Sequence, residues 1–324
     1  MRSSHSQETS RWKEIVARIV CVGVISVTLT QWAQGQSSAF AVLSSSDVTM
    51  KNRVSINRGN VGGTTILMGR GNAAAPDLIS GDVIASANAS QGLNCSNNPP
   101  GTTAICLGND SEIAGACVTG GGAVSLPSEC AKGTDTSAGV TMLSPAIGDM
   151  ATLSANLAAL QTTETLPAIV LGTRGTATIS TSGGGCLGGG CLYVVSVASI
   201  TTGTNSTLTL SGASTDTLVI NIGIIDPGSL QLGNGASVVL ADGITPDRVI
   251  FNLIGSGTTA QLGNHTVFNG SLLAPQGQFT SGDGDTPNPV LINGALLFGG
   301  SIAIGNNTNL AFYPFVGAGG GGVE

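Results

Sequence analysis

The residues whose type and spacing best suit chemistry are two pairs of carboxylates in loops. Asp283 and Asp285 lie in TSGDGDTPNP, and Asp242 and Asp247 lie in LADGITPDRV. Hydrolysis of a glycoside needs two acids roughly 5–9.5 Å apart, but neither loop has the aromatic neighbours that sugar-binding sites commonly use. Asp283 and Asp285 are better candidates for a calcium site, because calcium binds carboxylate and backbone oxygens. Apart from this calcium site, the sequence predicts no cofactor.

His265 is the natural candidate for a catalytic base, but its setting argues against that role. Once the predicted signal segment described below is removed, it is the remaining histidine, so any Ser-His-Asp triad would need it. It lies in LGNHTVFNG, at the position that Gly235 and Asn307 hold in related phrases. We therefore expect an exposed turn residue and predict that the protein is not an enzyme. A polysaccharide-active enzyme is kept as an alternative.

The cysteines indicate disulfide bonds. Six remain after removal of the signal segment, and an even number fits an oxidising compartment. The expected pairs join nearest neighbours: Cys95 with Cys106, Cys117 with Cys130, and Cys186 with Cys191. The first four cysteines allow other pairings, whereas the last two bracket the short loop LGGG. The two-residue spacing of zinc ligands is absent.

Threonines occur in pairs two residues apart, which places both side chains of a pair on the same face of a strand. The pairs are Thr176 with Thr178, Thr207 with Thr209, and Thr215 with Thr217. A flat array of such pairs could order water and bind ice. Threonine is also simply a good outward residue of a strand, and SVVLADG, QGQFTSG and SIAIGNN lack the pairing.

The composition indicates the elements that position these residues. The 324 residues include 49 glycines and are 41% hydrophobic, 9% charged and 3% aromatic, whereas an average domain has about 25% charged residues. Plentiful aliphatic residues argue against disorder. Small turn residues with aliphatics suit an all-β fold with many turns, and the scarcity of aromatics predicts slim inward side chains.

Two phrases recur along the chain. One is read as FNGSLLAPQG from Phe268, INGALLFGG from Ile292 and ISGDVIAS from Ile79. The other, an aliphatic residue followed by Gly-Asn, is found at Leu107, Leu232, Leu262 and Ile304. Gly and Asn accept the left-handed backbone of a tight corner, and adjacent aliphatics can stack on the equivalent pair of the next coil. The repeats therefore predict a parallel β-helix (solenoid), with a β-sandwich as the alternative.

One α-helix is expected, from about Ser144 to Gln161. Ser144 can cap it, and Pro145 suits the first helical position. Apolar residues three or four apart form a single stripe: Ile147, Met150, Leu153, Leu157 and Leu160. The stripe predicts packing against the flank of a sheet.

The N-terminus has the pattern of a secretory signal. Basic residues precede the apolar run Ile19–Leu29, and small residues follow it; the run is shorter than the about 20 residues of a membrane span. We predict a signal peptide at 1–35 and a single β-solenoid domain at 36–316. A loop-rich, cysteine-containing excursion is expected at about 92–140, and a glycine-rich tail at 317–324.

Several segments together resemble a known family. LVINIG, SLQLGNGASVVLADG, DRVIFNLIG, FNGSLLAPQG and the closing AFYPF resemble the choice-of-anchor A domain family of exported bacterial surface proteins. The resemblance covers about 142–315 well and 40–91 loosely, and NGSLLAP and YPF are its most specific parts. It implies a right-handed β-helix with one flanking helix, at or outside the cell surface. The start, FAVLSSSDVTM, is also similar to ice-binding-like β-solenoid domains.

The expected function follows from export, a stacked scaffold and the lack of a catalytic cluster. Without the signal segment the chain carries seven basic and sixteen acidic side chains, a net charge of −9, which disfavours nucleic acid as a partner. The closing GAGGGGVE has no apolar span. We expect a secreted or cell-surface bacterial protein with a structural or adhesive role toward an extracellular polymer, matrix or surface ligand. Ice binding is the alternative, and the oligomeric state stays open.

Overall fold

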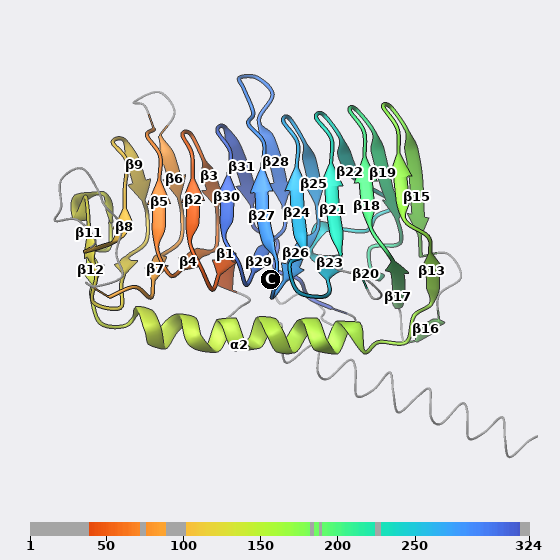
Figure 1. The fold of residues 1–324 in the computed structure, drawn as a ribbon, viewed down its shortest axis with the longest axis horizontal. Coiled ribbons are helices and arrows are strands. Elements are labelled where there is room, and N and C mark those ends of the chain that lie inside the picture. Colours follow the sequence, from red (N-terminus) through yellow and green to blue (C-terminus); the bar gives the residue numbers. More distant parts are fainter. Residues whose placement is uncertain are drawn as a thin grey trace, which may run out of the picture.

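The chain folds into a parallel β-helix in which three parallel sheets enclose one core (Figure 1). The computed structural model describes residues 39–71, 76–88, 102–181, 185–187, 190–223 and 228–317. Every named strand pair in these ranges is parallel except β16 with β17, which form an antiparallel ribbon. The predicted solenoid is therefore confirmed, and the alternative of a sandwich is wrong.

Each sheet takes one strand from each successive coil, so strands that are neighbours in a sheet come from neighbouring coils. Sheet A contains, in spatial order, β12 (Thr134–Asp135), β10 (Cys117–Val118), β7 (Val83–Ala85), β4 (Asn60–Gly63), β1 (Phe40–Ser44), β29 (Leu296–Phe298), β26 (Ser271–Ala274), β23 (Val249–Leu253), β20 (Thr217–Ile222), β17 (Gly190–Val197) and β13 (Glu164–Leu166), with β16 (Gly185–Leu187) beside β17. Sheet B contains, in the same direction, β11 (Ala123–Val124), β8 (Thr103–Cys106), β5 (Ile66–Met68), β2 (Val48–Met50), β30 (Ile302–Ile304), β27 (Gln278–Ser281), β24 (Thr259–Leu262), β21 (Ser229–Leu232), β18 (Ile200–Thr202) and β14 (Ile169–Leu171). Sheet C contains, in the opposite direction, β15 (Thr176–Ser180), β19 (Thr207–Ser211), β22 (Ser237–Ala241), β25 (Val267–Asn269), β28 (Val290–Asn293), β31 (Thr308–Ala311), β3 (Ser55–Asn57), β6 (Asp77–Ile79) and β9 (Ser111–Ile113).

The chain builds this β-helix from two stacks that meet in the middle. Strands β1 to β12 form the N-terminal stack, which grows outward from its first coil. The chain then runs back as the helix α2 (Gly139–Ala158), and strands β13 to β31 form the C-terminal stack, which grows from the far end toward the first coil (Figure 1). The last coil, β29–β31, pairs with the first coil, β1–β3, in all three sheets. We call this contact the joint.

The recurring phrases occupy equivalent places in neighbouring coils. Phe268 pairs with Ile292 across β25 and β28, and Leu272 pairs with Leu296 across β26 and β29. Leu272 and Leu296 are both fully buried in the interior column, and Ile79 belongs to the same column. The prediction that the phrase repeats because the coil repeats is therefore confirmed.

Some inward side chains are larger than the composition predicts. Four phenylalanines point into the interior, and they form two pairs with ring centroids 5.1 and 5.4 Å apart: Phe251 with Phe268, and Phe279 with Phe298. The few aromatic residues of the chain are thus concentrated in the coils near the joint, where they add packing volume that aliphatic side chains alone would not supply.

The corner between sheets B and C passes through a left-handed residue in coil after coil. Positive φ angles between 54° and 66° occur at this corner in Arg53, Asn205, Gly235, His265 and Asn307. The glycine two residues earlier is required for space, since a Cβ on Gly305 would lie 1.9 Å from the carbonyl oxygen of Gly282 in the next coil. The following hydroxyl closes the turn, as when Thr266 Oγ1 donates to the Gly263 carbonyl at 2.7 Å. The Gly-Asn phrase therefore marks this corner, as its recurrence predicts.

Helix α2 covers the outer surface of sheet A and bridges both stacks. Its buried residues are Gly139, Leu143, Ala146, Met150, Leu153 and Leu157. Two neighbouring asparagines of sheet A hold its second half. Asn221 Nδ2 donates to the Leu157 carbonyl at 2.9 Å, and Asn252 Nδ2 donates to the Ser154 carbonyl at 3.1 Å and to Asn221 Oδ1 at 2.9 Å. These buried amides fix the position of α2 along the sheet.

The helix begins earlier than the sequence indicates. Ser144 and Pro145 were expected at its N-terminus, but α2 starts at Gly139 with Ala138 before it, and Pro145 lies within the helix. Packing explains the difference, because Leu143 is buried against the N-terminal stack, where it lies against Gly62. Burial of this extra turn outweighs the hydrogen bond that the proline cannot donate.

The cysteine-containing region at 92–140 was expected to leave the stack, and over its described residues this prediction is wrong. Strand β8 pairs with β5, β9 with β6, and β10 with β7. These strands are two to four residues long and rich in small residues, so they lack the aliphatic alternation by which a strand is recognised. The predicted signal at 1–35 and the tail from 318 onward lie outside the described residues.

Asp77 is a buried carboxylate that makes stability depend on pH. It is fully buried, its Oδ1 accepts the Val54 N–H at 2.7 Å, and its Oδ2 has no partner. Burial raises its pKa, although the Val54 and Arg53 N–H groups oppose the shift. The folded state therefore binds a proton more readily than the unfolded state, in which the pKa of an aspartate is about 3.9. The stability that Asp77 contributes is fully present below this unfolded pKa. It is lost as the pH rises through the folded pKa.

Asp77→Asn is therefore expected to raise the midpoint of thermal unfolding at pH 7, because the amide keeps the Val54 acceptor without a charge. The gain should shrink as the pH falls through the raised pKa of folded Asp77, because the wild-type carboxyl is then protonated as well. Thermal melts of both proteins at several pH values test this. A variant that is less stable than the wild type at pH 7 would show that the buried charge of Asp77 does not destabilise the folded state.

Candidate functional site

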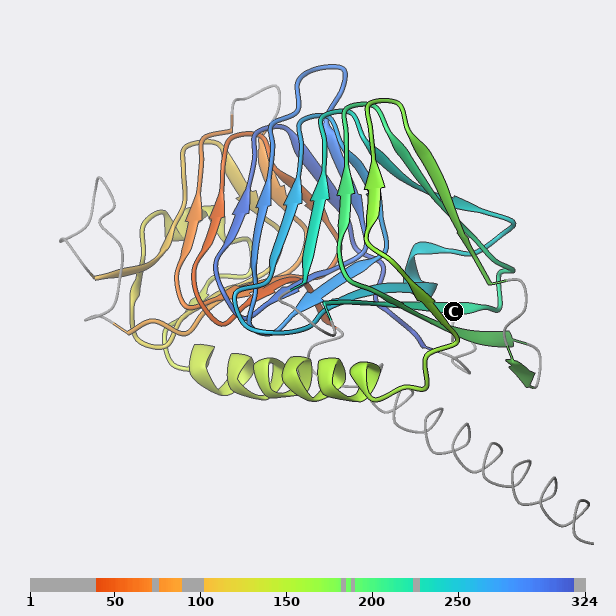
Figure 2. The same ribbon diagram turned by 45° about the vertical axis from the view of Figure 1, so that its right-hand side comes forward.

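Two of the three sheets present open outer surfaces. Sheet A is covered by α2, whereas Figure 2 shows sheets B and C without a covering element. The described strands of sheet B contain no charged residue, and those of sheet C contain two, the buried Asp77 and the exposed Glu112. Charged side chains instead gather where the strands end, so sheet B offers an uncharged face and sheet C a face with one exposed charge among its described strands.

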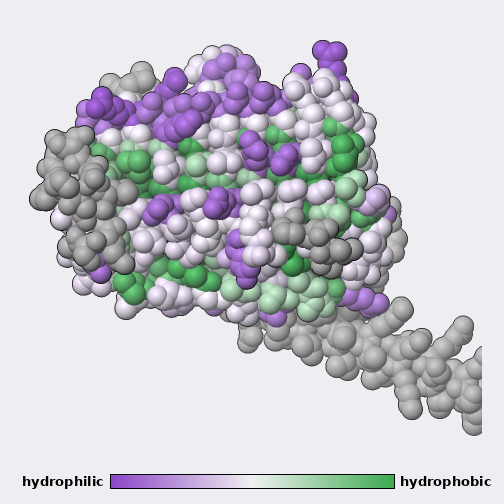
Figure 3. Space-filling view, viewed as in Figure 1, coloured by the Kyte–Doolittle hydropathy of each residue, from purple (hydrophilic) through white to green (hydrophobic). Residues whose placement is uncertain are grey.

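The face of sheet B carries one central row of outward side chains in register. From one end to the other the row is Val170, Thr201, Gln231, Gln261, Thr280, Ala303, Thr49 and Leu67. We call it the sheet B row. Val170 is 72% and Leu67 41% exposed. At the spacing of β-strands the seven intervals span roughly 33 Å. Figure 3 shows this side of the molecule, with hydrophilic residues along the upper rim and mostly pale or hydrophobic residues below it.

The sequence contains a signal for the sheet B row that single pairs of threonines do not reveal. Each member is the middle residue of an inward-outward-inward triplet such as VTM, ILM, LQL or IAI, just before the corner with sheet C. The outward residues differ in type from coil to coil, so they do not stand out as a motif until the coils are aligned.

The predicted threonine face divides in the structure. Thr176 pairs with Thr207, and Thr178 pairs with Thr209, on the outer side of β15 and β19 in sheet C. The neighbouring strand continues with Ser237 opposite Thr207. Thr217 does not join them, because it is fully buried in sheet A, and Thr215 lies in the turn before it. Four of the six threonines thus form one array at one end of sheet C.

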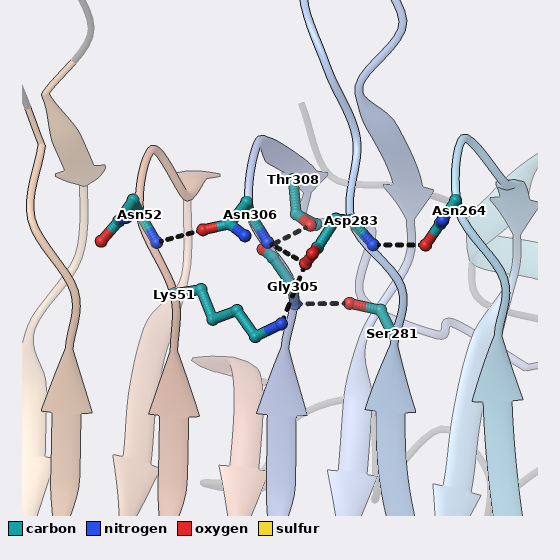
Figure 4. A network of polar contacts seen from close by, with 8 residues as sticks. All are labelled: Lys51, Asn52, Asn264, Ser281, Asp283, Gly305, Asn306 and Thr308. Carbon is teal, nitrogen blue, oxygen red and sulfur yellow. Dashed lines mark hydrogen bonds and ion pairs between the residues drawn. The ribbon is translucent and has the colours of Figure 1, made fainter.

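A ladder of side-chain amides follows the corner between the two faces (Figure 4). In each step a side-chain oxygen accepts the backbone N–H of the equivalent residue in the next coil. The steps are Asn234 to Asn264, Asn264 to Asp283, Asp283 to Asn306, Asn306 to Asn52, and Asn52 to Arg70, with distances of 2.8–3.1 Å. The ladder crosses the joint without interruption, so it ties the two stacks together along the corner.

Asp283, a predicted calcium ligand, is a member of this ladder. Its Oδ1 accepts the Asn306 N–H at 2.8 Å and lies 3.1 Å from Lys51 Nζ. The Asn306 N–H and the lysine lower its pKa. Asp285 does not converge with it; its carboxylate lies 3.8 Å from His265 Nδ1. Among the described residues no three His, Cys, Asp or Glu side chains form a group that could hold a metal ion.

The other two carboxylate candidates differ in what they contact, since Asp242 bonds through its carboxylate and Asp247 through its backbone carbonyl. Asp242 Oδ2 accepts the hydroxyl of Ser211, and the Asp247 carbonyl accepts the N–H of Val316 at 2.9 Å. His265 occupies the corner position shared with Gly235 and Asn307, with φ 57° and its side chain 38% exposed. This position agrees with the interpretation of His265 as a turn residue.

The described cysteines lie toward the two ends of the β-helix. Cys117 and Cys130 form a disulfide next to the outermost described coil of the N-terminal stack, as expected. Cys106 and Cys191 are also disulfide-bonded. Cys95 lies outside the described residues, as does the side chain of Cys186, although the backbone sets Cys186 opposite Cys191.

Solved structures that resemble this chain include ice-binding proteins. One from the Antarctic ascomycete Antarctomyces psychrotrophicus matches with a TM-score of 0.52 and 18% identity, over 86% of this chain and 96% of that chain. One from an Antarctic biological consortium matches with a TM-score of 0.49 and 14% identity, over 86% and 89% of the two chains. The DUF3494 domain of an ice-binding protein from Shewanella frigidimarina matches with a TM-score of 0.46 and 16% identity, over 86% of this chain and 96% of that chain. At 18% identity the first of these matches shows a similar fold and no more.

The sequence resembles both choice-of-anchor A domains and ice-binding-like β-solenoid domains, and other comparisons support one of these similarities. The curated proteins contain no match, and no helix in the described part of the chain has the length and hydrophobicity to cross a membrane. The family model of an ice-binding-like adhesive domain matches residues 14–306. That match supports the similarity to ice-binding-like β-solenoid domains, whereas the similarity to choice-of-anchor A domains stays a prediction. The chain belongs to the ice-binding-like adhesive domain family.

Proposed function

We propose that this protein is exported and acts without catalysis, by adhering to an extended extracellular surface through the outer face of sheet B. The observation that carries the proposal is the sheet B row, in which eight side chains in register are uncharged and at least partly exposed. A rigid face of this kind makes many weak contacts with a repeating polymer at little cost in conformational entropy. Membership of an adhesive domain family supports the same interpretation.

A charge placed in the middle of the face tests the proposal. Gln261 and Thr280 are neighbours in the sheet B row, and changing both to Glu would force unpaired charges to lose water on contact. The matched control changes Asn309 and Ser55, neighbours on sheet C, to Asp. Adsorption of the purified proteins to cellulose, chitin and peptidoglycan particles is measured by depletion from solution.

We expect the wild type and the sheet C control to adsorb equally to at least one of these particles. The sheet B variant should adsorb about tenfold more weakly, which corresponds to about 1.4 kcal/mol. Equal adsorption by all three proteins would remove sheet B from the proposal. Failure of the wild type to adsorb to any of the particles would remove these three polymers as its ligands.

Ice is the second candidate surface, and the threonine array of sheet C favours it. Thr176, Thr178, Thr207 and Thr209 present hydroxyls in two registered pairs on adjacent strands, a regular spacing that could order water. Structurally similar proteins are ice-binding proteins by name. Thermal hysteresis and ice recrystallisation are measured with the wild type and with Thr178→Lys and Thr209→Lys together. Activity that the double variant loses supports this candidate, and a wild type without activity at high concentration rejects it.

A further inference from the structure

The joint is a complete interface between two parts of the chain that are far apart in sequence. Its partners are paired in all three sheets: Val42 with Leu296, Thr49 with Ala303, and Ser55 with Asn309. The covalent connection between the two stacks lies elsewhere, in the segment that contains α2 (Figure 1). Nothing in the geometry of the joint therefore requires both of its sides to come from the same molecule.

The polar contacts across the joint select this pairing over a slipped one. Ser44 Oγ donates to the Gly300 carbonyl at 2.7 Å on one corner. On another corner the Asn52 N–H donates to Asn306 Oδ1 at 3.1 Å (Figure 4). Lys51 reaches past the last coil to Asp283. The two sides are thus complementary in register, hydrogen bonding and charge, and a second copy of this chain offers the same partners.

The link between the N-terminal stack and α2 is built as a short exposed turn. Residues 131–137 are exposed, but up to Asp135 they are bonded to the N-terminal stack, where the Asp135 carbonyl accepts the Thr119 N–H at 2.7 Å. Beyond β12 the side-chain contacts are local, with Asp135 Oδ1 accepting the N–H and the hydroxyl of Ser137 at 2.8 Å. Ala138, at the start of α2, makes no side-chain cap. Opening the turn at 136–138 itself gives up few interactions. Moving the N-terminal stack away as a unit also breaks the hydrogen bond from the Gly139 N–H to the Thr119 carbonyl and the burial of Leu143, contacts that the same stack of a second copy can restore.

We propose that the joint is exchangeable between copies, so that two molecules form a dimer in which each N-terminal stack closes on the C-terminal stack of the other. In this dimer each α2 would again cover one stack from each chain, so the contacts of the monomer are regained except those of the turn at 136–138. Swapping of an identical element needs no new interface. The dimer presents the sheet B row twice on one particle.

Crosslinking between two different single-cysteine variants tests the exchange. Thr49 and Ala303 are partly exposed neighbours across the joint, so Thr49→Cys is mixed with Ala303→Cys. The mixture is unfolded and refolded with native disulfides intact at mildly acidic pH, where thiols exchange slowly. A short bis-maleimide is then added. The control replaces Ala303→Cys by Gln231→Cys, which lies on the same face several strands from the joint. The doubly substituted Thr49→Cys, Ala303→Cys chain reports closure within one molecule.

We expect a covalent dimer from the first mixture when refolding is done at about 500 μM, with at least about tenfold less at about 5 μM, because exchange competes with closure within one chain. The Gln231→Cys mixture should give none. A covalent dimer that forms equally in both mixtures would be a non-specific association. Monomer alone at every concentration, while the double variant crosslinks internally, would overturn the proposal. Neither result depends on whether sheet B adheres to a polymer.

Discussion

Asn252→Ala is expected to lower the free energy of unfolding by about 3–5 kcal/mol, since each buried polar group left without a partner costs about 1–3 kcal/mol. Asn252 is fully buried, and its amide bonds the Ser154 hydroxyl, the Ser154 carbonyl and Asn221 Oδ1. Asn221 Oδ1 would lose its partner in the buried interface, and the half-buried Ser154 would lose both of its contacts with sheet A. Equilibrium unfolding in urea measures the loss, and hydrogen exchange of the second half of α2 should accelerate with it.

The chain provides a matched control in Asn293, which also bonds an asparagine of the adjacent coil. Its Nδ2 donates to Asn269 Oδ1 at 2.8 Å, and both residues are half-buried on the outer side of sheet C. Water can replace this contact, so Asn293→Ala should cost about 1 kcal/mol or less. Similar losses for the two variants would mean that Asn252 does not hold the helix.

Phe298→Ala is expected to cost about 3–5 kcal/mol, the usual range for a phenylalanine removed from a core. Phe298 is fully buried in β29, next to Ser44 of β1 across the joint, and its ring lies 5.4 Å from that of Phe279. The cavity would therefore open on the C-terminal side of the joint. Urea unfolding of the wild type and the variant measures the effect.

Phe298→Leu separates loss of volume from loss of the aromatic contact. The leucine keeps most of the apolar volume, so its cost should be about 1.5 kcal/mol or less. A leucine variant as unstable as the alanine variant would assign the stability to the pairing of the rings and not to the filling of the core.

The fold could be predicted where each coil repeats a local requirement. The Gly-Asn corner needs a residue with left-handed backbone and a glycine that approaches the next coil. These requirements select similar residue types at the corner of coil after coil. The order of the coils left no such trace. Nothing local in β1 or β29 indicates that the first coil pairs with the last, because the joint uses the same aliphatic residues as any other coil contact.

The candidate site was predicted only in part, for a related reason. The pairs Thr176–Thr178 and Thr207–Thr209 follow from alternation within one strand, so the sequence could place each pair on one face. The sheet B row depends on which strands are neighbours, and this is set by the stack and not by spacing along the chain. Asp283 had a role that the sequence did not indicate, because this candidate calcium ligand takes the place of an asparagine in the corner ladder. Its binding of calcium stays a prediction.

The described chain enters and leaves the β-helix on the side of α2. Phe40 and Phe315 both pack in the cluster beneath the helix, and the Gly317 carbonyl accepts a hydrogen bond from Arg248 Nη1 at 2.9 Å. Both ends of the described chain therefore lie on the helix-covered side, near the middle of the long axis (Figure 1). A protein that is held through either of these ends would turn sheet A and α2 toward the attachment. Sheets B and C would then both face the surroundings.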